Sequence, residues 1–169
     1  FRQAFSQVTN PAIDSLRETR VMSLKTRLGN LGNVLDEDSS QFDLLQLESP
    51  VLSTAEFAAM QNFMGAAACV VDCTFPVAEG EAGLHKALEE LLQNAANAVK
   101  DGASILILSD RGVDADRAPI PALLATAAVH HHLIREGTRT QCGLVIETGE
   151  ARESHHFCLL VGYGAGAIN

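Results

Sequence analysis

The chain alternates between short apolar runs and longer amphipathic segments, and this alternation restricts the folds open to it. Residues 104–109 (SILILS) enclose a continuous apolar run, which is typical of a parallel strand buried on both faces. The same reasoning predicts strands at residues 68–75 and 143–148, and helices at residues 80–101, 122–136 and 154–160. Strands that alternate with helices indicate β-α-β units. We therefore expect an α/β fold with mainly parallel strands, either part of a (β/α) barrel or an open sheet.

The first part of the chain gives weaker signals. Residues 15–18 predict a helical turn, and residues 21–28 alternate apolar and polar side chains as a half-buried strand does. Residues 44–47 predict another short strand. Ser53 or Thr54 is a suitable N-cap for a helix that extends to about Phe63.

Composition narrows the classes of function. The chain has 12 basic and 21 acidic residues, a formal net charge of -9, so its surface repels nucleic acid and anionic membranes. It has no apolar run long enough for a membrane helix. Its 4 cysteines are too few for a disulfide-stapled secreted domain and predict reduced thiols in a cytoplasmic protein. Its 169 residues predict a single domain, and the missing initiator Met predicts an interior piece of a longer protein.

Charged side chains follow two of the predicted strands. Asp110 and Arg111 come after the strand at residues 104–109, and Glu147 ends the next strand. Parallel α/β sheets usually bind ligands at the carboxyl ends of their strands. These residues, together with the pair Glu150 and Arg152, can either bind a small anion or form salt bridges against a neighbouring domain. Asp114, Asp116 and Arg117 extend the same possible network.

Two other motifs give weak evidence for chemistry. Adjacent side chains on a helix point about 100° apart, so His130, His131 and His132 do not converge on one metal ion. A metal enzyme that combines His130 with His155 remains an alternative. The glycines of residues 162–167 favour a helix stop over a phosphate loop, because they follow a predicted helix instead of a strand. No residue stands in a recognisable catalytic context.

Several stretches of the chain resemble one known family. They are residues 3–18 (QAFSQVTNPAIDSLRE), 21–24 (VMSL), 47–52 (LESPVL), 107–111 (ILSDR), 120–125 (IPALLA), 128–130 (AVH), 149–153 (GEARE), 155–157 (HHF) and 162–169 (GYGAGAIN). Spread over nearly the whole chain, they resemble the central domain of the large subunit of glutamate synthases.

This resemblance implies a parent enzyme that makes two L-glutamate from L-glutamine and 2-oxoglutarate. An amidotransferase domain releases ammonia, and an FMN barrel with an iron–sulfur cluster carries out the reduction, with electrons from a pyridine-nucleotide-oxidising subunit or from ferredoxin. The central domain lies between the two, resembles an incomplete FMN barrel and helps to form the ammonia path.

The resemblance transfers no catalytic residue, cofactor or metal ligand to this chain, so we expect the chain alone to be inactive. Its partners are then the other domains of the large subunit. The candidates for a domain interface or for the ammonia path are Thr9, Asn10, Pro11, Asp110, Arg111, Glu147, Glu150 and Arg152.

Overall fold

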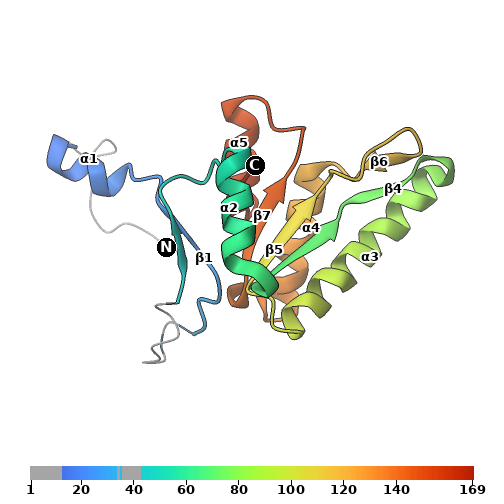
Figure 1. The fold of residues 1–169 in the computed structure, drawn as a ribbon, viewed down its shortest axis with the longest axis horizontal. Coiled ribbons are helices and arrows are strands. Elements are labelled where there is room, and N and C mark those ends of the chain that lie inside the picture. The colour runs from blue at the N-terminus through green and yellow to red at the C-terminus, as the bar shows by residue number, and fades with distance from the viewer. Residues whose placement is uncertain (1–12, 34, 36–42) are drawn as a thin grey trace, which may run out of the picture.

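A parallel four-stranded sheet lies at the centre of the α/β fold. The computed structural model describes residues 13–33, 35 and 43–169. The sheet has the order β3-β5-β7-β8, and each neighbouring pair is parallel. Its strands are β3 (Ala68–Asp72), β5 (Ile105–Ser109), β7 (Gly143–Glu147) and β8 (Ala167–Ile168) (Figure 1). The predicted α/β class with parallel strands is confirmed.

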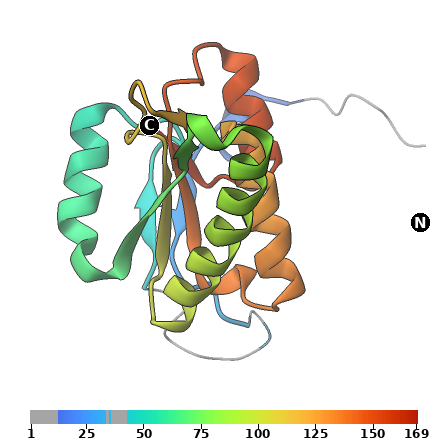
Figure 2. The same cartoon turned by 90° about the vertical axis from the view of Figure 1, so that its right-hand side faces the viewer.

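The two faces of the sheet have separate cores. Every residue of β5 and β7 is buried, which explains the uninterrupted apolar run before the polar last residue of each strand, Ser109 or Glu147. Leu106 and Ile146 face a core shared with three helices, α3 (Gly80–Lys100), α4 (Ala122–Arg135) and α5 (Ser154–Gly162). Ile107 and Val145 face a second core that contains Phe57 of helix α2 (Thr54–Met64). Figure 2 shows α2 on one side of the sheet and α3 and α4 on the other.

Local sequence signals account for the ends of the helices. Ser53, one of the two residues predicted as the N-cap, caps α2 and forms a capping box with Glu56. Helix α3 buries Leu91, Ala95 and Val99 along one stripe. Gly102 follows α3 with φ +97°, a conformation that glycine adopts without strain.

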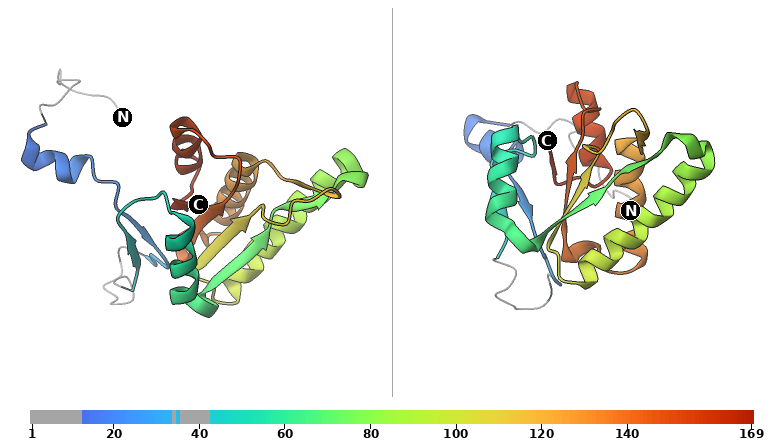
Figure 3. Two further views of the ribbon diagram at one scale, coloured as in Figure 1. Left: turned by 45° about the horizontal axis from the view of Figure 1, so that its top comes forward. Right: turned by 45° about the vertical axis from the view of Figure 1, so that its right-hand side comes forward.

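The N-terminal part forms a small ribbon beside α2. Strands β1 (Thr26–Leu28) and β2 (Leu45–Leu47) pair antiparallel, and Figure 3 shows them on the side of the molecule away from α3. The prediction of a strand over residues 21–28 is wrong for its first five residues. Asp14 caps helix α1 (Ser15–Val21) with its side chain, and this helix extends over the start of the predicted strand.

Two other predicted boundaries are wrong. The strand expected at residues 68–75 breaks after Asp72, whose Oδ1 accepts hydrogen bonds from the backbone N and Oγ1 of Thr74 (3.0 and 2.8 Å). The chain then forms β4 (Thr74–Pro76), which pairs antiparallel with β6 (Arg117–Pro119), a segment in which the sequence predicts no strand. Strand β8 was not expected. In the described part of the chain, no helix has the length and apolar character needed to cross a membrane.

Candidate functional site

Three of the predicted site residues meet at the carboxyl ends of β5 and β7. The two strands pair in parallel with Ser109 opposite Glu147, so the side chains that follow them lie close together. Arg111 donates from its Nε to Oε1 of Glu147, and Ser109 donates from its Oγ to Oε2 at 2.5 Å. The carboxylate of Glu147 raises the pKa of Arg111 by hydrogen bonding and by charge. Glu147 is 7% exposed, so this ion pair anchors the loop after β5 to a buried carboxylate.

Asp110 makes a second connection between the same two loops. Its Oδ2 accepts hydrogen bonds from Oγ1 of Thr148 at 2.6 Å and from the backbone N of Gly149 at 3.1 Å. The backbone N of Asp110 donates to the carbonyl oxygen of Glu147 at 3.1 Å. We call Ser109, Asp110, Arg111, Glu147 and Thr148 the strand-end cluster.

The strand-end cluster borders a polar hollow of about 450 Å³. Its lining contains two carboxylates and one guanidinium, so the local charge disfavours the small anion considered from the sequence. The lining residues are Thr54, Asp110, Arg111, Glu147, Thr148, Gly149 and Asn169.

Sequence reasoning named Asp110, Arg111 and Glu147 and missed their partners Ser109 and Thr148. In the sequence, only the position of these two hydroxyl residues pointed to them, because Ser109 is the last residue of β5 and Thr148 directly follows β7.

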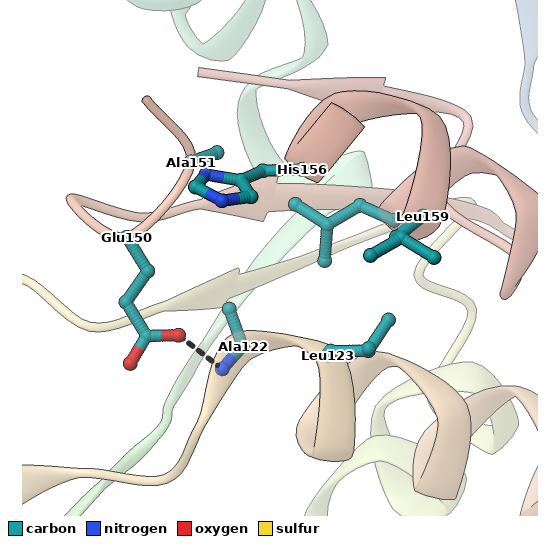
Figure 4. A pocket seen from close by; sticks show the side chains of 7 residues that line it. Ala122, Leu123, Glu150, Ala151, His156 and Leu159 are labelled. Atoms are coloured by element: carbon teal, nitrogen blue, oxygen red, sulfur yellow. Dashed lines mark hydrogen bonds between the residues drawn. The ribbon is translucent and has the colours of Figure 1, made fainter. Parts of the chain in front are cut away.

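Glu150 and Arg152 belong to a different part of the surface. Oε2 of Glu150 accepts a hydrogen bond at 2.8 Å from the backbone N of Ala122, the first residue of α4 (Figure 4). Pro121, the residue before the helix, makes no side-chain capping bond. Arg152 donates from its Nε to the carbonyl oxygen of Gly149 at 3.2 Å. The two side chains therefore fix local backbone. Glu150 contacts the strand-end cluster only through its backbone N, which donates to Oγ1 of Thr148 at 3.1 Å.

A hollow of about 230 Å³ lies beside the Glu150 cap, between α4 and α5. Figure 4 shows that Leu123 and Leu159 lie on its apolar side and His156 on its polar side. Nδ1 of His156 accepts a hydrogen bond from the backbone N of Arg152 at 3.2 Å. The imidazole therefore helps to hold the loop that carries Glu150.

Glu150→Ala is expected to lower the free energy of unfolding by about 1 kcal/mol, because one backbone N–H at the start of α4 loses its acceptor. Urea denaturation of the wild-type and variant chains measures this difference. Glu153→Ala is the matched control, since Glu153 precedes α5 and makes no side-chain capping bond. Equal losses in the two variants would contradict a capping role for Glu150.

The predicted network of Arg111, Asp114, Asp116 and Arg117 is wrong. Arg117 donates from its Nη2 to Oδ2 of Asp72 at 2.8 Å and from its Nε to Oγ1 of Thr74 at 2.7 Å. Oδ1 of Asp114 accepts from the backbone N of Asp116 and of Arg117. Arg111 therefore pairs with Glu147 of β7, and Arg117 pairs with Asp72 of β3. These pairings depend on how the strands are aligned in the fold and not on proximity in sequence.

The histidines on α4 have a structural environment. Nδ1 of His130 accepts a hydrogen bond at 2.9 Å from Nε of Arg139, which also donates to the carbonyl oxygens of Cys142 and Gly164, each at 2.8 Å. Burial and the charge of Arg139 lower the pKa of His130. No group of three or more His, Cys, Asp or Glu within the described residues could hold a metal ion.

The four cysteines are free thiols, as the sequence predicts. Cys73 and Cys142 are buried, and Cys158 is exposed. Burial raises the pKa of Cys73 to about 12, so its thiol stays protonated at neutral pH.

The remaining candidates, Thr9, Asn10 and Pro11, lie outside the residues that the structure describes.

Comparison with known proteins gives a family over the whole chain. The model of the glutamate synthase central domain matches residues 1–169. The chain is 57% identical over 169 residues to the glutamate synthase [NADPH] large chain of Azospirillum brasilense. The matched region covers 100% of this chain and 11% of that protein. It is 46% identical over 172 residues to the glutamate synthase [NADH] of Saccharomyces cerevisiae, and this match covers 99% of the chain and 8% of the yeast protein. It is 42% identical over 171 residues to the chloroplastic ferredoxin-dependent glutamate synthase of Spinacia oleracea, and this match covers 99% of the chain and 10% of the spinach protein. The chain spans about a tenth of the length of these relatives, and it belongs to the glutamate synthase central domain family.

Proposed function

We propose that the chain is the non-catalytic central domain of a glutamate synthase large subunit. In this role it links an amidotransferase domain to an FMN domain that also holds an iron–sulfur cluster, and it helps to form the ammonia path between them. The parent enzyme then makes two L-glutamate from L-glutamine and 2-oxoglutarate in the cytoplasm. The family match over residues 1–169 and the large part of each relative outside this region support the proposal.

The pairing within the strand-end cluster is the observation that carries the scaffold role. Both carboxylates are already bound by groups of the same domain, Glu147 by Arg111 and Ser109, and Asp110 by Thr148 and Gly149. Such fixed carboxylates suit a rigid wall better than proton transfer to a substrate. A wall that keeps out bulk water protects a small neutral intermediate such as ammonia from protonation.

The sheet also supports the idea of a partial barrel. Helices α3, α4 and α5 pack on one face, as helices do on the outside of a (β/α) barrel. The opposite face, which strand side chains alone would fill in a closed barrel, is covered by α2 and β1, so the barrel is open on that side. We propose that the domain is a (β/α) barrel that lacks some of its strands.

Arg111 is the residue with which to test the interface role. Its side chain is 64% exposed although Glu147 anchors it, so its outer surface is free to meet a neighbouring domain. In the complete enzyme, Arg111→Ala is expected to raise the ratio of glutamine hydrolysis to glutamate formation by roughly tenfold, equivalent to ~1.4 kcal/mol of lost coupling. Glutaminase and synthase rates measured on the same preparation give this ratio.

Two controls separate coupling from local damage. Arg135→Ala removes an exposed arginine at the end of α4, away from the strand-end cluster. The single variant Arg111→Ala leaves the buried carboxylate of Glu147 without its partner arginine. The double variant with Glu147→Gln also removes that charge, so it tests whether the effect comes from an unpaired buried charge. An unchanged ratio in both Arg111 variants would reject the interface role of the strand-end cluster.

A further inference from the structure

A second surface, far from the strand-end cluster in sequence, has the features of a docking groove. It lies between β2 and α2 and has a volume of about 370 Å³. On the helix side, its walls come from residues spaced three and four apart, which form one stripe of α2. We call this surface the β2–α2 groove, and its lining residues are Leu45, Gln46, Leu47, Glu48, Ser49, Val51, Leu52, Glu56, Ala59, Met60 and Phe63.

The β2–α2 groove exposes apolar side chains at both ends of α2. Phe63 is 78% exposed and Val51 is 47% exposed, although both line the groove. Ala59, one helical turn from Phe63, is also exposed, so the exposed apolar surface continues along the helix wall of the groove. Single exposed apolar residues are ordinary, but an apolar surface of this kind marks an interaction site. Met60, at 4% exposure, forms part of the floor and packs into the core beneath it. A partner therefore gains apolar contact here without any rearrangement of the core.

The strand side of the groove offers backbone groups. The ribbon has two strands, so among the described residues β2 pairs with β1 along one edge and with no strand along the other. Successive side chains of a strand point to opposite faces. Because Leu45, Gln46 and Leu47 all line the groove, it meets β2 edge-on. An open strand edge beside an apolar wall is the arrangement that binds an added strand.

The charge of the groove restricts its partner. Its two charged lining residues, Glu48 and Glu56, are both acidic. Oε2 of Glu56 already accepts hydrogen bonds from the backbone N and Oγ of Ser53, at 2.8 and 2.6 Å. Glu48 lies 3.1 Å from Nζ of Lys25, and both side chains are largely exposed, so this pair is weak. A Lys or Arg on the partner, near Glu48, complements this charge.

We propose that the β2–α2 groove receives an extended segment from another domain of the same large chain. The segment adds a third strand to the β1–β2 ribbon, places apolar side chains against Phe63 and Met60, and brings a basic residue to Glu48. This inference rests on the proposed role as a central domain. The related large chains are about ten times longer than this chain, so a covalently attached segment has a high effective concentration at the groove.

Photo-crosslinking in the complete large chain tests the occupant. p-Benzoylphenylalanine replaces Phe63, and mass spectrometry of the irradiated protein identifies the captured peptide. The expected product is an intramolecular cross-link to an extended, basic segment outside residues 1–169. Capture of a second copy of the chain, capture of residues 1–169 alone, or no cross-link would each overturn the proposal. The same probe in place of the exposed Asn62, which does not line the groove, is the control.

Hydrogen exchange gives a readout that does not depend on cross-linking geometry. In the complete chain, Phe63→Asp is expected to raise the exchange rates of the β2 amides about tenfold, equivalent to ~1.4 kcal/mol. Asn62→Asp adds the same charge one residue away and is expected to leave these rates unchanged. Unchanged exchange in Phe63→Asp would overturn the strand addition. If exchange is unchanged in Phe63→Asp while Arg111→Ala still raises the ratio of glutamine hydrolysis to glutamate formation, the docking groove is rejected and the proposed central-domain role stands.

Discussion

Leu106→Ala is expected to lower the free energy of unfolding of the 169-residue chain by about 2–5 kcal/mol, the range for large-to-small changes in well-packed cores. Leu106 is 0% exposed on β5, which lies between β3 and β7, and its side chain faces the core shared with α3 and α4. The neighbouring strands hold this site rigidly, so the cavity collapses only partly. A typical domain has a stability of about 5–15 kcal/mol, and the loss is a large part of it.

Urea denaturation followed by circular dichroism measures the loss. Leu124→Ala is the matched control, because Leu124 lies on α4 with 41% exposure. Its truncation is expected to change stability by less than about 1 kcal/mol. Similar losses in both variants would contradict the position of Leu106 at the centre of the larger core.

The elements that the sequence predicted well are those with strong local signals. Strands β5 and β7 are buried on both faces, so their apolar runs have no polar interruption. Helix α3 is long enough for its apolar stripe to recur over several turns, and Gly102 marks its end. Helix α2 has a capping box that is visible as Ser53 and Glu56. In each case the signal lies within the element itself.

The missed elements depend on contacts between distant residues. Strands β4 and β6 have three residues each, and their register pairs Thr74 with Pro119 across more than forty positions of sequence. The two residues of β8 become a strand only because they lie beside β7. Such short segments have too few side chains to show a period. Tertiary pairing decides their structure, and a local pattern does not contain that information.

The site was predictable in its position but not in its contacts. Parallel topology alone brings the ends of β5 and β7 together, and so it places Arg111 near Glu147. The partner of each arginine depends on side-chain rotamers and on strand register. For this reason the guanidinium of Arg117 pairs with Asp72 and not with the nearby Asp114 or Asp116. Glu150 was grouped with the cluster from sequence, although its carboxylate caps α4.

Gly164→Ala is expected to lower the free energy of unfolding by about 2–4 kcal/mol through two separate effects. Helix α5 ends in a Schellman motif, in which the backbone N of Ala165 donates to the carbonyl oxygen of Leu160 at 3.0 Å and that of Gly164 to Val161 at 3.1 Å. The motif holds Gly164 at φ +118°, which residues with a Cβ rarely adopt. An added Cβ would also overlap the imidazole of His130.

The ring of His130 has little freedom to move away from that Cβ. Arg139 donates to its Nδ1 and also to the carbonyl oxygen of Gly164, so a shift of the imidazole disturbs both bonds. Adding His130→Ala to Gly164→Ala is therefore expected to recover the part of the loss due to overlap and leave the part due to φ. Measurement near pH 8 keeps His130 neutral, because burial and the charge of Arg139 lower its pKa.

Gly162→Ala is the control for this pair of variants. Gly162 is the last residue of α5, and a Cβ added there meets nothing within 4 Å. Alanine is a better helix former than glycine by about 1 kcal/mol, so this variant is expected to be as stable as the wild type or slightly more stable. A loss in Gly164→Ala no greater than that in Gly162→Ala would show that the turn after α5 tolerates a side chain, and it would contradict the close packing of Gly164 on His130.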